Sequence, residues 1–342
     1  MEFICYKSFA NYFFMKIPTR HYKSILKLVF IMSLLFCNTL ATAQKKGCND
    51  PLANNQEGFA TINDGSCKYN STAVKAQLVA NLPTTLTESS GLIYFKGSLW
   101  SHNDDTDTNI YELNSTSGEV LRKIKLPKIS NTDWEEISQD STYIYIADTG
   151  NNYQGNRNNL HILRMSKTSF LEEKPSIDTI SFTYFDQKEF QKQKPNTTDF
   201  DLEAFVVSND SIYLFSKQWK SRKTTLYVLP KVPGNYIAKA KGTLDVNGLI
   251  TGATYNETKK QVVLCGYTRF LKPFLYLLYD YPKHDFFEGN HRKIKLQIPF
   301  HQIEGIATDG TFYYLSNEKF DFKSLIHTPP ALWKIDLSEF LK

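Results

Sequence analysis

Short runs in which apolar or aromatic side chains alternate with polar ones dominate the chain from residue 75 onward. This period of two is typical of β-strands, whose successive side chains point to opposite faces of a sheet. The 20 Tyr and 24 Phe residues add to the strand tendency. We find no convincing amphipathic helix longer than two turns. The pattern therefore predicts an all-β fold.

The strand pattern recurs as a module, which we find five times along the chain. Each module opens with a small or acidic residue and an apolar strand, and three further strands follow. The opening strands are expected at residues 89–93, 134–138, 202–206, 250–254 and 303–307. Their spacing of 45 to 68 residues predicts a β-propeller of about five four-stranded blades, or six if residues 186–198 hide another blade.

The last module lacks a fourth strand, because the chain ends at Lys342. A spare strand at residues 76–80 precedes the first module. We expect it to pair into the last blade and to close the ring, which would remove exposed sheet edges that invite aggregation. The propeller is therefore expected to span residues 75–342.

Residues 1–43 have the features of a signal peptide. Lys23 and Lys27 precede an apolar run at residues 28–36, and a small-x-small cleavage pattern ends at Ala43. The apolar run is well short of the ~20 residues that span a bilayer. We predict an exported protein, extracellular, periplasmic or on the cell surface, with no membrane span after cleavage.

Most of the formal charge of +5 lies in that segment, which carries a net +4. The remaining chain has 35 basic and 34 acidic residues, so it offers no general attraction for nucleic acid or anionic lipid. We expect no nucleic-acid partner, and we expect a monomer.

Cysteine positions predict a disulfide in an N-terminal segment at residues 44–70. Cys48 and Cys67 bracket a short polar loop, and export would place them in an oxidising compartment. Cys265 lies in an apolar run and is expected to be a small buried residue.

The segment between these cysteines resembles a short repeat of exported bacterial surface proteins, with the pattern Gly-Cys-x-Asp-Pro through Asp-Gly-Ser-Cys. A disulfide can hold such a segment, which is too small for its own core. Asp50 and Asp64 could ligate calcium, but capping of turns is the favoured interpretation.

The run from Tyr145 to Asn152 resembles the NHL-type propeller repeat, whose core is Val-Ala-Asp-x-Gly-Asn-x-Arg. The resemblance implies that Asp148 binds backbone amides in a turn and that Gly150 takes a positive φ there. The opening patterns Glu-Gly-Ile and Leu-Glu-Ala-Phe also resemble esterase-like phytase and SdiA-regulated propellers. These resemblances support the fold more than any chemistry.

In a propeller the opening strands line a central channel. The openings align Ser90, Glu135, Glu203, Thr251 and Glu304 at one position. Three glutamates that converge in a channel repel one another unless they are protonated or neutralised. Calcium, which prefers oxygen ligands, could relieve this repulsion at Glu135, Glu203 and Glu304. Alternatively, the glutamates accept hydrogen bonds from neighbouring backbones, and water fills the channel.

The second strands end in an adjoining ring of His102, Asp148, Lys217, Tyr267 and Asn317. The leading hypothesis is a protein that binds a glycan, peptide or small metabolite at the channel mouth through Asp148, Lys217, Tyr267 and Asn317. The alternative is a calcium-dependent hydrolase of phosphoesters, esters or lactones, with His102 moving a proton. A third hypothesis is a scaffold that binds another protein. No Gly-x-Ser-x-Gly, His-Glu-x-x-His or phosphate-loop motif occurs.

Overall fold

The computed structural model describes residues 44–298, 300–322 and 326–341. The chain divides into two units, 1–45 and 46–342, and the first is almost wholly outside the described residues. The predicted signal peptide at 1–43 therefore also lies outside them. In the part of the chain that the structure describes, no helix is long and apolar enough to cross a membrane.

The second unit is built from antiparallel groups of four strands. The first group is β5 (Ser89–Phe95), β6 (Ser98–Asn103), β7 (Asn109–Leu113) and β8 (Val120–Lys125). The second is β9 (Trp134–Gln139), β10 (Tyr143–Asp148), β11 (Leu160–Ser166) and β12 (Ile177–Tyr184), with the short helix α2 (Lys167–Leu171). The third is β13 (Asp201–Ser208), β14 (Ser211–Lys217), β15 (Thr224–Pro230) and β16 (Gly234–Leu244). In each group the chain runs from the centre of the ring to its rim.

Two further groups complete the ring. One is β17 (Leu249–Asn256), β18 (Gln261–Tyr267), β19 (Pro273–Tyr279) and β20 (Asn290–Leu296). The other is β21 (Ile303–Thr308), β22 (Tyr313–Asn317), β25 (Ala331–Ile335) and β4 (Gln77–Asn81). The remaining strands are β1 (Lys46–Gly47), β2 (Ile62–Asn63), β3 (Thr72–Val74), β23 (Phe320–Phe322) and β24 (Ile326–Thr328), and three 3-10 turns lie at Thr84–Leu86, Phe286–Glu288 and Ser338–Phe340.

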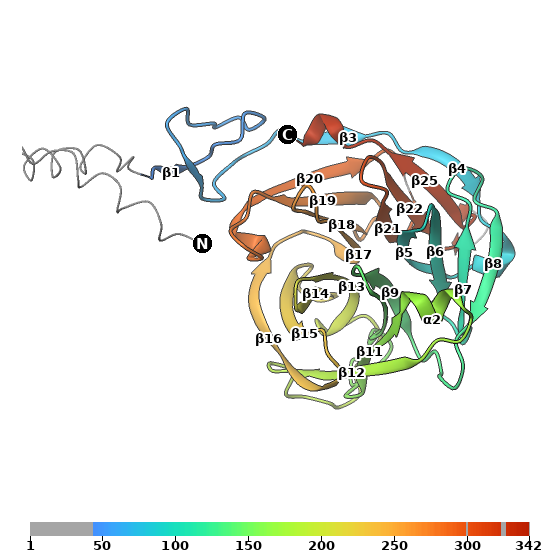
Figure 1. The fold of residues 1–342 in the computed structure, drawn as a ribbon. Helices are drawn as coiled ribbons and strands as arrows, with labels where there is room; N and C mark the ends of the chain where they lie inside the picture. The colour runs from blue at the N-terminus through green and yellow to red at the C-terminus, as the bar shows by residue number, and fades with distance from the viewer. Residues whose placement is uncertain (1–43, 299, 323–325, 342) are drawn as a thin grey trace, which may run out of the picture. The chain divides into compact units, whose positions relative to one another are not determined.

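The innermost strands β5, β9, β13, β17 and β21 contact one another in a closed cycle around a central axis (Figure 1). The predicted all-β propeller is therefore confirmed. Parallel pairing of β12 with β16 joins two groups into one sheet, and β3 adds to β20. Because sheets and groups do not correspond one to one, the number of blades stays a prediction. No strand lies in residues 186–198.

The ring closes through the N-terminal strand, as the sequence predicts. β4 pairs antiparallel with β25, with Ala80 opposite Leu332 and Gln77 opposite Lys334. The strand that directly precedes the first group in sequence is thus the outer strand of the last group, and β25 has a partner on each side.

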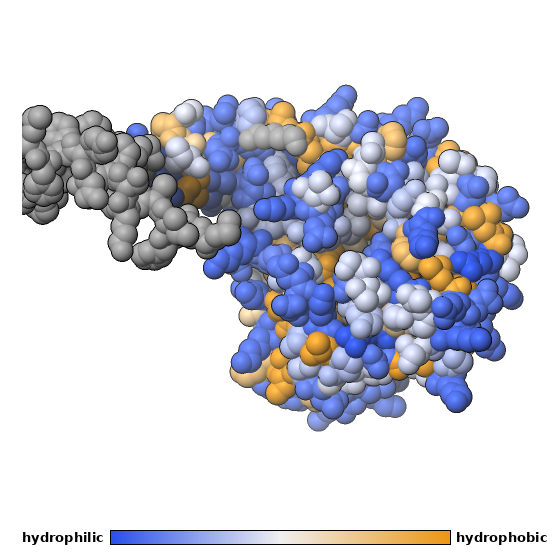
Figure 2. Space-filling view, in the orientation of Figure 1, coloured by the Kyte–Doolittle hydropathy of each residue, from blue (hydrophilic) through white to orange (hydrophobic). Residues whose placement is uncertain are grey.

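Hydrophobic cores fill the spaces between neighbouring groups, because the strands are apolar on both faces. In β18, Val263 and Cys265 pack toward the group that contains β21 and β22, whereas Val262 and Leu264 pack toward β13 and β14. Cys265 is a free, buried cysteine, as expected. Figure 2 shows mainly hydrophilic side chains on the face in view, with apolar ones scattered among them.

Side-chain hydrogen bonds connect the innermost strands across the ring. The Ser90 hydroxyl donates to the carbonyl of Glu135 at 2.6 Å, and the Thr251 hydroxyl donates to the carbonyl of Ile303. Two of the aligned opening positions therefore join one group to the next, and they satisfy carbonyls that would otherwise be buried without a partner.

Glu136, which is fully buried, makes the widest of these connections. Its carboxylate accepts hydrogen bonds from the backbone N–H of Ala253 at 2.8 Å and of Ile137 at 3.0 Å, and a third from Leu92. One side chain thereby joins β17, β9 and β5. Burial raises the pKa of Glu136 well above its usual value, against the effect of these donors.

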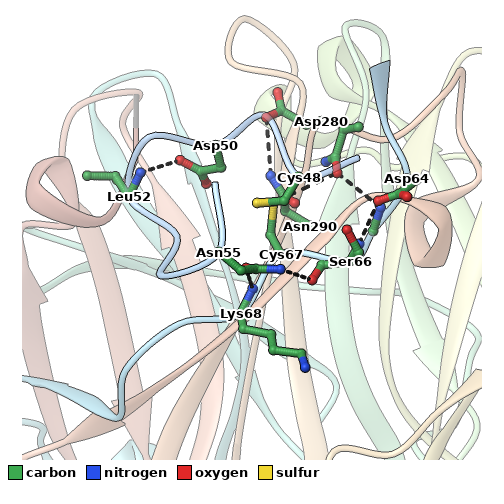
Figure 3. Close-up of a disulfide and its surroundings, with 12 residues drawn as sticks. Cys48, Asp50, Leu52, Asn55, Asp64, Ser66, Cys67, Lys68, Asp280 and Asn290 are labelled. Carbon is green, nitrogen blue, oxygen red and sulfur yellow. Dashed lines mark hydrogen bonds between the residues drawn. A yellow bond between two sulfur atoms is a disulfide. The ribbon is translucent and has the colours of Figure 1, made fainter. Parts of the chain in front are cut away.

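The N-terminal segment is a disulfide-closed loop that docks on the ring (Figure 3). Cys48 and Cys67 form the predicted disulfide. One carboxylate oxygen of Asp50 accepts hydrogen bonds from the hydroxyls of Tyr69 and Tyr279, both at 2.7 Å, which ties the loop to β19. Its other oxygen caps the turn at Leu52, as the favoured interpretation expects.

We predict that Glu136→Ala destabilises the fold by roughly 3–5 kcal/mol, because it leaves three buried N–H groups without their acceptor. Glu136→Gln keeps one acceptor oxygen and should cost less. Urea unfolding followed by tryptophan fluorescence measures both changes, with the exposed Glu189→Gln as the control. Equal stability of Glu136→Ala and the control would contradict the proposed role.

Candidate functional site: a carboxylate-lined cavity at the channel mouth

A cavity of about 250 Å³ lies where the innermost strands begin and the second strands end. Its lining comprises Ser90, Asp104, Asp133, Glu135, Asn152, Asn196, Glu203, Lys217, Trp219, Tyr267, Gln302, Glu304 and Glu318. Six of these side chains are carboxylates, and one is a lysine. The loops that follow the second strands and the segments that lead into the innermost strands meet at this end of the ring, which is why residues far apart in sequence share one cavity.

The structure brings several of the sequence-predicted site residues together. Glu135, Glu203 and Glu304 all line the cavity, and so do Lys217 and Tyr267 from the ends of β14 and β18. These residues come from the groups that open with β9, β13, β17 and β21. These five residues of the predicted site therefore lie together around one cavity, and their role in binding stays a prediction.

Three other sequence-predicted residues are buried outside the lining. Asp148 is fully buried and forms an ion pair with Arg157 at 2.6 Å. Asn317 donates to the carbonyls of Glu318 and Pro329, and its oxygen accepts from the indole of Trp333. Both side chains therefore hold strand ends and loops in place.

His102 is also fully buried and outside the lining. Its ring lies edge-on to Trp134, with centroids 5.8 Å apart, and its Nδ1 lies 3.1 Å from the carbonyl of Asn103. Burial lowers the pKa of His102 to about 4, so the imidazole is neutral at neutral pH. His102 therefore lies outside this cavity, and its predicted role in moving a proton stays a prediction.

Lys217 is the only lysine that lines this cavity, and the residue is 3% exposed. Its ammonium forms an ion pair with Glu203 and lies 4.8 Å from the ring centroid of Trp219 and 5.5 Å from that of Tyr267. Although burial acts to lower it, the pKa of Lys217 is raised well above its usual value by Glu203 and other nearby acids. A charged lysine therefore offsets part of the negative charge.

The remaining carboxylates are left in excess. Burial raises the pKa of Asp104 to about 8 and of Asp133 to about 6, with neighbouring carboxylates adding to both shifts. Burial also raises the pKa of Glu304 to about 7, against the effect of Lys217. Burial likewise raises the pKa of Glu135 and of Glu318 well above the usual value for a glutamate. The cavity therefore retains protons near neutral pH and loses them only at an electrostatic cost.

Sequence reasoning missed Asp133, Asp201, Gln302 and Trp219. Asp133 and Asp201 stand two residues before Glu135 and Glu203, and Gln302 stands two residues before Glu304. Residues two apart in a strand point to the same face, so this position of the module was a usable signal.

Gly150 supports the site in a way that the repeat resemblance did not predict. The predicted positive φ is wrong, since Gly150 is absent from the residues with that conformation. Instead, a Cβ at this position would overlap the carboxyl groups of Asp133 and Glu135. The absence of a side chain lets both acids lie against the backbone.

The donor set fits calcium poorly. Oxygens of Glu135, Asp201 and Glu203 lie within 4.8 Å of one another, and Glu304 is not part of this cluster. However, the oxygens of Asp201 accept hydrogen bonds from the Asn151 N–H at 2.7 Å and the Trp219 indole at 2.8 Å. Glu203 is paired with Lys217. A cation would share these oxygens with donors that already use them and would lie near the Lys217 ammonium, so we derive no chemical step through a metal.

No protein-family model and no curated protein matches the chain. Similar solved structures include glutaminyl cyclase of Myxococcus xanthus, at 12% identity and a TM-score of 0.45, over 78% of this chain and 99% of that one. A chain of the Mitotic Checkpoint Complex is 9% identical, with a TM-score of 0.33, over 72% of this chain and 61% of that one. The computationally designed Ika4 protein is 8% identical, with a TM-score of 0.30, over 64% of this chain and 98% of that one. Scores this low carry no argument about ligand or activity. The NHL-type and phytase-like resemblances stay predictions.

The charge of Glu304 should make stability depend on pH. Between the ordinary glutamate value of 4.5 and about 7, the folded chain holds a proton on Glu304 that the unfolded chain has lost. Stability therefore falls as the pH rises through this window. Glu304→Gln should be roughly 1–3 kcal/mol more stable than the parent at pH 8 and equal to it at pH 4, by urea unfolding. An equal gain at both values would contradict this.

Gly150→Ala should destabilise the fold by roughly 1–3 kcal/mol, because the added methyl group forces apart Asp133 and Glu135. Gly58→Ala is the matched control, since nothing lies within 4 Å of a Cβ there. Thermal unfolding of the two variants checks the difference. Matching melting temperatures would show that the acids do not crowd Gly150.

Proposed function

We propose that the chain binds a small ligand that carries a positively charged amino group, such as an amine or a peptide amino terminus. The observation that carries the proposal is the lining of the 250 Å³ cavity, in which six carboxylates surround one lysine that is already paired. A ligand ammonium would supply the missing positive charge and would take the place of the bound protons.

The other lining residues suit such a ligand. Half-buried Trp219 offers an aromatic ring on which apolar groups pack favourably, while Tyr267 is 5% exposed and the Lys217 ammonium lies near both rings. Asn152, Asn196 and Gln302 add neutral hydrogen-bonding groups. Ligand cavities commonly measure about 300–1,000 Å³. The ligand should therefore be about as large as a single amino acid or an aromatic amine.

Among the ligand classes expected from the sequence, an amino-bearing metabolite or peptide uses this charge, whereas a neutral glycan does not. Calcium is the second candidate, on the grounds of the clustered oxygens of Glu135, Asp201 and Glu203. The hydrogen bonds and the ion pair that already occupy Asp201 and Glu203 weigh against it.

Calorimetric titration with tyramine tests the proposal, because tyramine combines an ammonium group with an aromatic ring. We expect saturable binding of tyramine and none of 4-ethylphenol, which lacks the amino group. Affinity should rise with pH from 5.5 to 8.5, as Asp133, Glu304 and Asp104 lose their protons while the amine stays charged. Protons should be released on binding.

The double variant Glu135→Gln with Glu304→Gln should weaken tyramine binding by about tenfold or more, since hydrogen bonds to charged groups contribute roughly 1.5–3 kcal/mol each. The exposed Glu189→Gln is the control. Equal binding of tyramine and 4-ethylphenol would overturn the proposal. Calcium binding that the double variant abolishes, without any amine binding, would favour the second candidate instead.

A further inference from the structure

We infer that a second cavity, at the rim of the ring beside the disulfide-closed loop, binds a small organic anion with an apolar body. This cavity measures about 750 Å³, within the usual range for small-molecule sites. It shares no residue with the carboxylate-lined cavity. The inference therefore goes beyond the proposed function and does not depend on it.

The floor of the cavity is apolar and is provided mainly by β19. Phe274 and Tyr276 lie at alternate positions of this strand, so their rings occupy the same face of the sheet. They stand opposite Lys295 and Lys293 of β20 in the strand register. Half-buried Tyr276 therefore presents an aromatic ring beside these lysines, and Phe274, which is 1% exposed, supports this surface from within the core.

The charge of the lining is positive. It includes Lys272, Lys293 and Lys295, and no carboxylate belongs to it. Lys272 and Lys295 are exposed and form no ion pair within the described residues. An anion would find two free ammonium groups above an apolar floor, and a cation would be repelled.

Lys293 is held in a fixed position at the base of this group. Its ammonium lies 3.8 Å from the ring centroid of Phe274 and donates to the carbonyls of Val246 and Asn247. Burial lowers the pKa of Lys293 to about 8, and Asp245 offsets only part of the effect. The ammonium therefore has an incomplete counter-charge, which a bound anion would complete.

His291 adds a polar atom that has no partner. It lines the cavity at the next alternate position of β20, and its buried Nε2 makes no hydrogen bond in the described structure. A buried polar atom without a partner is costly, so such atoms often face a ligand or water. The exposed lysines, rather than this covered nitrogen, indicate a polar head group at one side of the cavity.

The remaining wall is formed by the segment that follows the disulfide. Cys67, Tyr69, Asn70 and Ser71 all line the cavity. This wall is held in place by the Cys48–Cys67 disulfide and by the hydroxyl of Tyr69 on Asp50. The disulfide-closed loop therefore has a role in shaping a binding surface, besides covering one edge of the sheet.

The test compares 4-phenylbutyrate with 4-phenylbutan-1-ol and 4-phenylbutylamine, which share the apolar body and differ in charge. Calorimetric titration of the intact protein should show saturable binding of the carboxylate and binding of the alcohol that is weaker by about tenfold. An excess of 4-phenylbutylamine should leave the affinity for 4-phenylbutyrate unchanged, because the amine does not enter this cavity. Equal affinity for carboxylate and alcohol would overturn the proposed anion preference.

Matched variants locate the site. Lys272→Gln with Lys295→Gln should weaken 4-phenylbutyrate binding by about tenfold and leave binding of the alcohol unchanged. Lys192→Gln with Lys194→Gln, two exposed lysines elsewhere, is the control. Ser71→Trp should block both ligands by filling the cavity mouth.

The variant Glu135→Gln with Glu304→Gln should bind 4-phenylbutyrate as the parent does, so the two cavities can fail separately. Loss of 4-phenylbutyrate binding in that variant, or full binding in both the double-lysine variant and Ser71→Trp, would overturn the inference. Binding of an acidic peptide, with no binding of 4-phenylbutyrate, would overturn it as well.

Discussion

The close approach of the innermost strands at the axis is the constraint on which the rest of the structure depends. Strands that meet this closely leave no room for water between their backbones, so each buried N–H and carbonyl needs a partner from within the ring. The carboxylate of Glu136 meets this need for three strands at once. At Gly252, a Cβ would come within 2.7 Å of the carbonyl of Glu304, so only glycine fits there without a shift.

The same geometry explains why charge gathers at one end of the channel. The opening residues of each group point toward the axis, and the acids among them cannot move apart. Lys217 reduces the repulsion by pairing with Glu203, and bound protons reduce it further. Burial thus holds back ionisation of the carboxyl groups in this cavity, and the proposed function rests on this excess of acids.

Most of the fold could be predicted from the sequence because its strands are buried on both faces and because the same order of strands recurs in each group. That periodicity located the opening strands and the closing strand β4, and it aligned Glu135, Glu203 and Glu304. The periodicity could not predict whether the side chain at the end of a strand lines the cavity or packs against neighbouring loops. Asp148 and Asn317 share a register with Lys217, yet local partners turn them into the protein.

Other parts of the site depend on three-dimensional crowding, which a linear pattern does not carry. The role of Gly150 arises from Glu135 of β9 and from Asp133, which directly precedes that strand, whereas the sequence resemblance suggested a turn conformation. The rim cavity likewise arises where a loop docks on β19 and β20. No single segment of the chain contains its pattern of lysines and aromatic rings.

The pairing of β4 with β25 has a consequence for the order of folding. These strands lie near opposite ends of the described chain, so bringing them together costs loop-closure entropy and makes the topology strongly non-local. During synthesis β4 emerges early and β25 emerges late, so β4 cannot pair with β25 until nearly all of the described chain has been made. A chain shortened before residues 331–335 would therefore lack the partner of β4, and the exposed edges of such a ring would be open to pairing with other molecules.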